Sequence, residues 1–200
     1  MVDFDEWVFD SSRMAENAIK VLDEGLPDVI GRVDHDSVVP MAHWRDSGFG
    51  AVLFLRYSID DQGESRPGVV RAVCRRDESS WVALPNWSGS GWSHDPLEPS
   101  ETHTDLGDRT IYVAGGSRTD HPRDGEPAIV VCGRHSPQVE SMFVHQNGRT
   151  IMSRATGHWG AWIVCLAEWA PYTITVLDGR GVTRGQLVGP SDLPAPGSFA

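Results

Sequence analysis

The side chains best suited to chemistry lie in residues 94–105, where histidines stand beside carboxylates. Imidazole and carboxylate groups can bind a divalent metal ion, or act as a general base oriented by a neighbour. Only His103 and Asp105 have the i, i+2 spacing that places two side chains on one side of an extended chain. The segment would have to fold back on itself to bring all its candidates together. These candidates are His94, Asp95, His103 and Asp105.

Two tryptophans precede this segment and suggest a different role. Trp87 and Trp92 flank the run Ser-Gly-Ser-Gly, in which glycine frees the backbone and serine offers hydrogen bonds. Indole faces in such a setting form a stacking surface for a sugar, a peptide or a nucleobase. The alternative is that both rings fold inward and close the core. The ligand-binding site predicted from the sequence consists of Trp87, Trp92, His94 and Asp95.

Familiar catalytic motifs are absent from the sequence. It contains no G-x-S-x-G elbow, Walker loop, H-E-x-x-H or Cys-x-x-Cys motif. Ser117, in Gly-Gly-Ser-Arg, is interpreted as a turn residue because no base stands at a fixed offset from it. Cys74, Cys132 and Cys165 are widely spaced among apolar residues, which predicts buried thiols and no disulfide framework. The sequence therefore favours a protein without catalytic residues, metal or cofactor.

Charge is distributed unevenly along the chain. The net charge is −11; residues 1–36 hold ten acidic and three basic residues, whereas residues 127–200 hold four and five. This acidity argues against nucleic-acid binding and is compatible with a basic protein partner. No run of about 18 apolar residues predicts a membrane span, and the acidic first ten residues do not resemble a secretory signal. We therefore expect a cytoplasmic protein that does not bind membranes.

The first part of the chain predicts one helix and a small sheet. Residues 11–24 carry apolar side chains at i, i+4, i+7 and i+8, which is typical of a helix with one buried face. Asp10 is an available N-cap, and Gly25 followed by Pro27 ends the pattern. Residues 49–59, 69–76 and 80–84 then predict a three-stranded antiparallel meander, with the helix on one face. Trp81 lies in the last of these strands and is expected in the core.

The second part predicts a β-sandwich. Asn147-Gly148 provides the positive φ angles of a tight hairpin between two of its strands, and short antiparallel strands at regular spacing are typical of two packed sheets. Trp159, Trp162 and Trp169 are expected in its core. The predicted strands are residues 110–114, 128–132, 139–145, 150–154, 159–167, 172–177 and 182–188.

These patterns predict a mainly β fold, with an N-terminal helix on a small antiparallel sheet followed by a C-terminal antiparallel β-sandwich. The regions are residues 1–84, a loop at 85–109, residues 110–189 and an extended tail at 190–200; one integrated domain at 1–189 is the alternative. A second loop is expected at 117–127. The function predicted is a non-catalytic binding or protein-interaction module for a protein or small-molecule ligand. The alternatives are a small metal-assisted hydrolase that uses the 94–105 segment and a structural subunit of an assembly.

Overall fold

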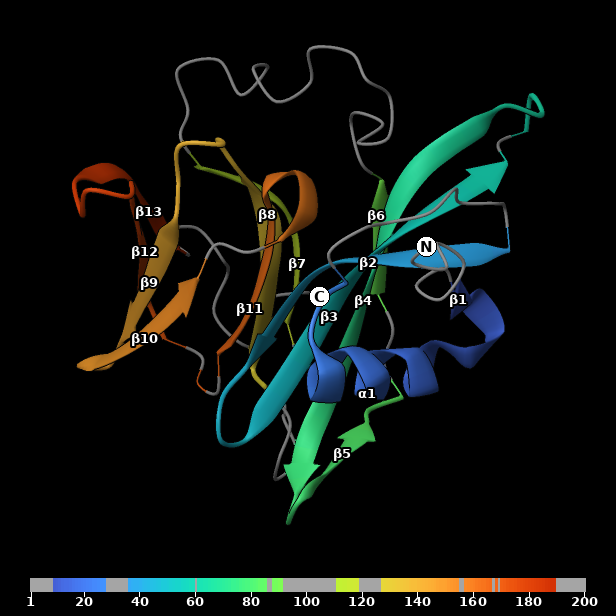
Figure 1. The fold of residues 1–200 in the computed structure, drawn as a ribbon, viewed down its shortest axis with the longest axis horizontal. Coiled ribbons are helices and arrows are strands. Elements are labelled where there is room, and N and C mark those ends of the chain that lie inside the picture. Colours follow the sequence, from blue (N-terminus) through green and yellow to red (C-terminus); the bar gives the residue numbers. More distant parts are fainter. Residues whose placement is uncertain are drawn as a thin grey trace, which may run out of the picture.

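The fold is mainly β, with one α-helix and three antiparallel sheets (Figure 1). This computed structural model describes residues 9–27, 36–59, 61–85, 88–91, 111–118, 127–154, 157–166, 168 and 170–189. The fold class predicted from the sequence is confirmed. The predicted tail at 190–200 lies outside the described residues.

The helix forms where its apolar spacing and its end signals predict it. A 3₁₀ turn, η2 (Ser11–Arg13), leads into α1 (Met14–Glu24), whose residues Ala18, Val21 and Leu22 are fully buried. The Asp10 carboxylate accepts a hydrogen bond from the N–H of Ser12 at 2.8 Å. At the other end, Gly25 adopts a φ of +93° and donates its N–H to Val21. Both ends therefore have a local cause in the sequence.

The helix lies on a sheet that we call the helix-bearing sheet. Its strand order is β1-β2-β3-β4-β5, and β6 pairs with the part of β4 that β5 leaves open. Val52 and Phe54 of β3 pack toward α1, whereas Leu53 and Leu55 pack into the core on the opposite face. Both faces are thus covered, as a central strand with apolar residues on both sides predicts. The strands are β1 (Phe9–Asp10), β2 (Ser37–Arg45), β3 (Phe49–Ile59), β4 (Ser65–Asp77), β5 (Ser80–Ala83) and β6 (Ser88–Gly91).

The remaining described strands form two further sheets. The middle sheet has the order β11-β8-β7, and β11 packs against β2 and β3. The outer sheet has the order β10-β9-β12-β13 and lies on the far side of the middle sheet from α1 (Figure 1). One apolar core contains residues from all three sheets. The strands are β7 (Ile111–Arg118), β8 (Ile129–His135), β9 (Ser141–Gln146), β10 (Arg149–Arg154), β11 (Ala161–Leu166), β12 (Tyr172–Leu177) and β13 (Thr183–Gly189).

Two of the sequence predictions need correction. Ser117 does not lie in a turn: it belongs to β7 and pairs with Val130 of β8, after a register shift between Val113 and Gly115. Ala114 is the extra residue of this bulge, and the strand continues through the paired Gly115 and Gly116 into the predicted 117–127 loop. The predicted 85–109 loop likewise contains β6. Its backbone completes the edge of β4, a long-range pairing that local composition does not reveal.

Strand β2 was not predicted from the sequence. Its Pro40 removes a backbone donor, and the register shifts between Pro40 and Ala42. A bulge is one of the places where a strand tolerates proline. The strand nevertheless supplies Val39, Met41 and Trp44 to the core. A sequence pattern interrupted by proline therefore conceals one of the principal strands of the helix-bearing sheet.

Candidate functional site

The site predicted from the sequence lies outside the described residues. This holds for Trp87, Trp92, His94 and Asp95, and for the metal candidates His103 and Asp105. The binding-site and hydrolase hypotheses that use them remain predictions. Trp81, at the start of the same segment, is 5% exposed, and the Arg76 guanidinium lies 4.8 Å from its ring centre. Its predicted place in the core is confirmed.

Two of the other tryptophans expected in the core can be placed. Trp162 is 2% exposed and belongs to the core, as predicted. Trp159 packs against the same core while partly exposed, and its φ of +53° belongs to the short 3₁₀ segment η3 (His158–Gly160). Trp169 lies outside the described residues.

The cysteines are free, buried thiols, as predicted. Burial raises the pKa of Cys74 to about 12. It also raises the pKa of Cys132, which the neighbouring Arg71 lowers in part, and that of Cys165. Because the thiolate is the reactive form, these three groups are poor nucleophiles and poor metal ligands at neutral pH. Their contribution is to packing.

Two described histidines are held in the neutral form by their surroundings. Burial lowers the pKa of His43 and of His135. His135 is 5% exposed; its Nδ1–H donates to the Ser136 carbonyl at 2.8 Å, and its Nε2 has no hydrogen-bond partner among the described residues. Within the described ranges, no group of three or more His, Cys, Asp or Glu side chains could hold a metal ion. The described histidines therefore offer no metal centre.

A network of polar contacts on the described surface holds the β12–β13 hairpin. Asp178 Oδ1 accepts hydrogen bonds from the N–H groups of Arg180 and Val182, each at 2.9 Å. Its Oδ2 contacts Arg184, at 2.8 Å from Nε and 2.5 Å from Nη2. The backbone hydrogen bond from Val182, followed by the Arg184 side chain, lowers the pKa of Asp178. The Asp178 carboxylate therefore stabilises the turn in which it lies.

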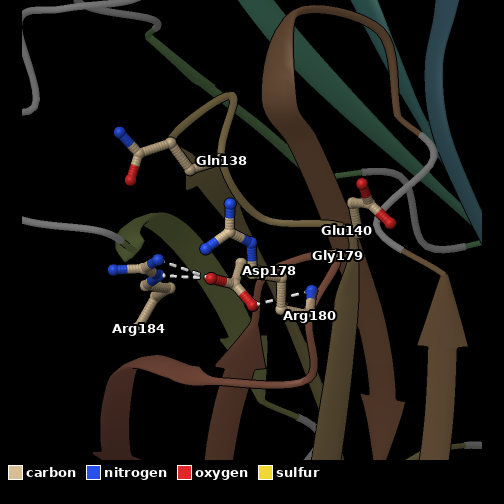
Figure 2. A pocket seen from close by; sticks show the side chains of 6 residues that line it. All are labelled: Gln138, Glu140, Asp178, Gly179, Arg180 and Arg184. Carbon is tan, nitrogen blue, oxygen red and sulfur yellow. Dashed lines mark hydrogen bonds and ion pairs between the residues drawn. The ribbon is translucent and has the colours of Figure 1, made fainter.

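A surface hollow of about 500 Å³ opens beside this turn (Figure 2). Arg180 extends into the middle of the hollow between Gln138 and Glu140, and Asp178 with Arg184 forms one wall. The Glu140 carboxylate lies against the Cα of Gly179, where a side chain would collide with it. The hollow thus presents a guanidinium, a carboxylate and an amide, a set that suits a polar peptide side chain better than an apolar ligand.

The strand that leaves this hollow, β13, is the last strand of the outer sheet, and no described strand pairs with its far side. The carbonyl of Leu177 accepts a hydrogen bond from the N–H of Glu140 at 2.9 Å. The backbone N–H and C=O groups of Leu177 therefore point toward β9. Because backbone direction alternates along a strand, Ile174 is directed to β13 and meets Leu187. Gln186 and Val188 therefore point their N–H and C=O groups away from β12.

The side chains along this edge add little protection against pairing. Residues 185–189 contain neither proline nor a charged residue, although both are common guards of exposed edges. Arg184, the charged residue of β13, is tied to Asp178. Val188 is 64% exposed, and Val182 at the start of the hairpin return is 50% exposed. Among the described residues, the edge of β13 therefore has neither a paired strand nor a charged or proline guard at residues 185–189.

The sequence predicts β13 and the turn before it, but not the open edge or the hollow. The regular spacing of short strands predicts a strand at 182–188, and Asp-Gly-Arg-Gly at 178–181 predicts the turn before it. The open edge depends on the order of the strands in the outer sheet, in which β12 pairs with β9 instead of β11. Such long-range pairing leaves no local signal. The hollow likewise forms only because the β8–β9 turn, with Gln138 and Glu140, lies beside the β12–β13 hairpin.

Neither the helices nor any known protein assigns this chain a function. Among the helices of the described part, none has the length and apolar character needed to cross a membrane. Protein-family models, curated proteins and solved structures gave no match to the chain.

Proposed function

We propose that this protein is a non-catalytic protein-interaction module that captures an extended peptide segment by adding it as a strand to β13. The observation that carries the proposal is the outward direction of the backbone groups of Gln186 and Val188 at an edge without a described neighbour. In strand addition, main-chain hydrogen bonds supply affinity, and pockets for alternate side chains supply specificity. The outward main-chain groups of β13 support the first element, and the polar hollow beside its N-terminal end supports the second.

The specificity would come from the two ends of β13. Near its C-terminal end, the exposed Val188 offers an apolar contact on the outer face. Beyond its N-terminal end, Arg180 and Glu140 in the hollow offer charges of both signs to a polar side chain. The fitting peptide is extended, with an apolar residue that contacts Val188 and a polar or charged residue further along that reaches the hollow. The protein would thus recognise sequence as well as extended conformation.

The site predicted from the sequence is kept as a second recognition surface of the same module. Trp87 and Trp92 would stack on a partner, with His94 and Asp95 beside them. Replacing both tryptophans by alanine should then weaken partner binding and leave the melting temperature within a few degrees. A large loss of stability would mean that the rings belong to the core.

The setting proposed for this module is the cytoplasm. Three buried, unpaired cysteines suit a reducing compartment. A net charge of −11 disfavours nucleic acid as the partner. The expected partner is a protein, and the acidic N-terminal region suits one that carries basic residues elsewhere on its surface.

A displayed library of random peptides tests the strand-addition proposal. Peptides selected on the wild-type protein should protect the amide hydrogens of Gln186 and Val188 from exchange, whereas those of Leu187 and Gly189 are protected beforehand by β12. Gln186→Pro removes one outward hydrogen-bond donor and should therefore weaken peptide binding about tenfold or more. The variant should still fold, because proline is tolerated on the open side of an edge strand. The control is Thr175→Lys, which keeps the backbone hydrogen bonds of β12 and should bind the peptides normally. Thr175→Pro would not serve, because it removes a hydrogen-bond donor inside the sheet.

Two results would contradict the proposal. The first is that the library yields no peptide bound by the folded protein. The second is that the selected peptides bind Gln186→Pro as tightly as wild type and leave the Gln186 and Val188 amides unprotected. Binding lost instead in the Trp87→Ala/Trp92→Ala variant would move the recognition surface to the segment predicted from the sequence.

A further inference from the structure

The open edge of β13 can pair with the same edge of a second copy of this chain. We propose that two copies of this chain associate by antiparallel pairing of their β13 strands about a twofold axis at Leu187. The inference rests on the proposed function, because both use the same edge, and it names the partner as a second copy. The two outer sheets would join into one continuous sheet across the axis.

The register follows from the backbone of β13. Pairing with β12 is regular from Gly185 to Gly189 and shifts between Val176 and Leu177, which leaves Arg184 as an extra residue at a bulge. Bulges interrupt further pairing, so residues 185–189 form the usable segment. Only a twofold axis at Leu187 pairs this whole segment with itself. Gln186 of each copy then lies opposite Val188 of the other.

Backbone hydrogen bonding is satisfied in this register. Gln186 and Val188 both direct their N–H and C=O groups to the open side, so each opposed pair exchanges two hydrogen bonds. The two symmetry-related pairs supply four bonds. An axis at Gln186 would instead bring the bulged Arg184 opposite Val188. The geometry of the edge therefore selects the Leu187 axis over its nearest alternative.

Side chains are compatible with this close approach. On the core-facing side, the two Leu187 side chains meet at the axis, and Gly185 of one copy lies opposite Gly189 of the other, where no side chain obstructs them. On the outer side, the Gln186 stem covers Val188, which is 64% exposed in the single chain. No charged residue lies in the paired segment. The paired segment therefore carries no charge that would repel its own copy and no side chain at Gly185 or Gly189 that would block the approach.

The charge of the whole molecule permits this approach. The strongly acidic part of the sequence is residues 1–36, with a balance of −7, whereas residues 127–200 have a balance of +1. Helix α1, from the acidic part, lies on the side of the molecule remote from the outer sheet (Figure 1). Two copies that meet at β13 thus approach through their least acidic regions. The short paired segment makes a small interface, so the dimer should exchange readily with its monomers.

Sedimentation velocity over a wide concentration range tests the association. The wild-type protein should shift from monomer to dimer as its concentration rises. Gln186→Pro and Val188→Lys should each weaken the dimer about tenfold or more, the first by removing a hydrogen-bond donor and the second by adding a charge to the edge. Thr175→Lys is the matched control, because it adds the same charge to β12 and should dimerise normally. Thermal unfolding verifies that each variant is folded.

Disulfide trapping tests the register. Paired residues that exchange hydrogen bonds have Cα atoms about 5.5 Å apart, within the range that a disulfide spans. Mild oxidation of a mixture of Gln186→Cys and Val188→Cys proteins, carrying different tags, should therefore give the mixed dimer. Either variant alone should give little dimer, since each cysteine faces the other position. The native cysteines are buried and do not compete.

The outcomes separate this inference from the proposed function. A wild-type protein that stays monomeric while selected peptides still protect the Gln186 and Val188 amides would overturn self-pairing and leave peptide capture standing. A dimer that resists both Gln186→Pro and Val188→Lys would overturn the β13 interface. Efficient trapping of Gln186→Cys alone would overturn the Leu187 axis. A dimer lost in both edge variants, with mixed trapping only, supports the inference even if the library yields no peptide.

Discussion

The helix-bearing sheet and the outer sheet bury their strands in different ways. In β3, residues 50–55 are all buried because α1 covers one face and the middle sheet covers the other. In β12, burial alternates: Tyr172, Ile174 and Val176 are buried, and the residues between them are partly exposed. The first sheet is thus enclosed on both faces, whereas the second has one partly exposed face and, within the described residues, an edge strand without a paired neighbour. The proposed recognition site therefore lies in the less enclosed of the two sheets.

The largest expected difference between the two regions comes from Phe54→Ala. The Phe54 ring is fully buried on the helix side and lies edge-on to Phe9, with 6.4 Å between ring centres. Removing it should lower the free energy of unfolding by about 3–5 kcal/mol. Thr175→Ala, on the face of the outer sheet away from the core, should change it by less than about 0.5 kcal/mol. Denaturant unfolding measures both free energies, and similar losses would show that the two sheets do not differ in how they bury their strands.

A pair of glycine replacements separates crowding from backbone strain. A Cβ on Gly50 would lie 2.6 and 2.8 Å from the methyl carbons of Leu22 and 3.2 Å from Trp81. Gly50→Ala should therefore cost about 1–3 kcal/mol by overpacking the helix-bearing sheet. Gly148→Ala, in the β9–β10 turn, meets no atom within 4 Å but has a φ of +74°, so its cost of about 1 kcal/mol comes from the backbone.

A double variant checks this assignment. Shortening Leu22 to alanine frees the space that the new methyl group of Gly50→Ala needs. The two changes should therefore be less destabilising together than the sum of their separate effects. Leu22→Ala should give no such relief to Gly148→Ala. Additive losses at Gly50 and Leu22 would show that crowding against the helix is not the cause.

The same contrast explains how much of the fold could be predicted. Residues 49–59 and 172–177 are strands with the predicted bounds, because burial on two faces or on one leaves a clear pattern in the sequence. The Asn147-Gly148 turn, with φ angles of +49° and +74°, is confirmed for the same local reason. Strand β2 was missed because Pro40 interrupts its pattern. Ser117 was misassigned because adjacent glycines resemble a turn.

The candidate site was less accessible to prediction. Asp178 and Gly179 signal a turn in any context, and nothing local shows that Glu140 from another turn lies against them. The open side of β13 depends on which strands pair with β12. Aromatic and histidine-rich segments, in contrast, attract attention through composition alone, which is why the sequence pointed to residues 87–95. Edge strands are a property of topology and become visible only in the fold.

The pH dependence of stability should include a contribution from buried histidine. Burial lowers the pKa of His135 below the ordinary value of 6.5, with the nearby Arg134 acting in the same direction and the Ser136 hydrogen bond opposing it. The unfolded chain then binds protons more readily. Stability from the neutral form is complete above about pH 6.5 and falls as the pH falls toward the folded pKa.

Unfolding measured between about pH 8 and about pH 5 tests this contribution. His135→Phe should flatten the loss of stability on acidification, because phenylalanine has no proton to bind. His43, whose pKa burial also lowers, belongs to the helix-bearing sheet and remains in this variant, so part of the slope should persist. An unchanged slope in His135→Phe would assign the whole effect to other groups.

The smallest expected effect belongs to Asp178 and concerns the outer sheet alone. Backbone hydrogen bonds, first from Val182, and the Arg184 side chain lower its folded pKa below the ordinary value of 3.8. Its stabilising contribution is therefore complete above the unfolded pKa and is lost as the pH falls through the folded pKa. Asp178→Asn keeps an oxygen acceptor for the turn but lacks the charge, so its stability should depend less on pH in this range, and salt should narrow the difference.

Hydrogen exchange can localise this effect to one region. If Asp178 holds only its own hairpin, acidification or Asp178→Asn should speed exchange at the β13 amides that pair with β12, such as Leu187, while the β3 amides at Leu53 and Phe54 keep their protection. The hairpin is exposed and its ion pair is screened, whereas β3 opens only with the enclosed core. Equal acceleration in both strands would mean that the outer sheet and the helix-bearing sheet unfold as one unit, and that the open edge of β13 is as rigid as the core behind it.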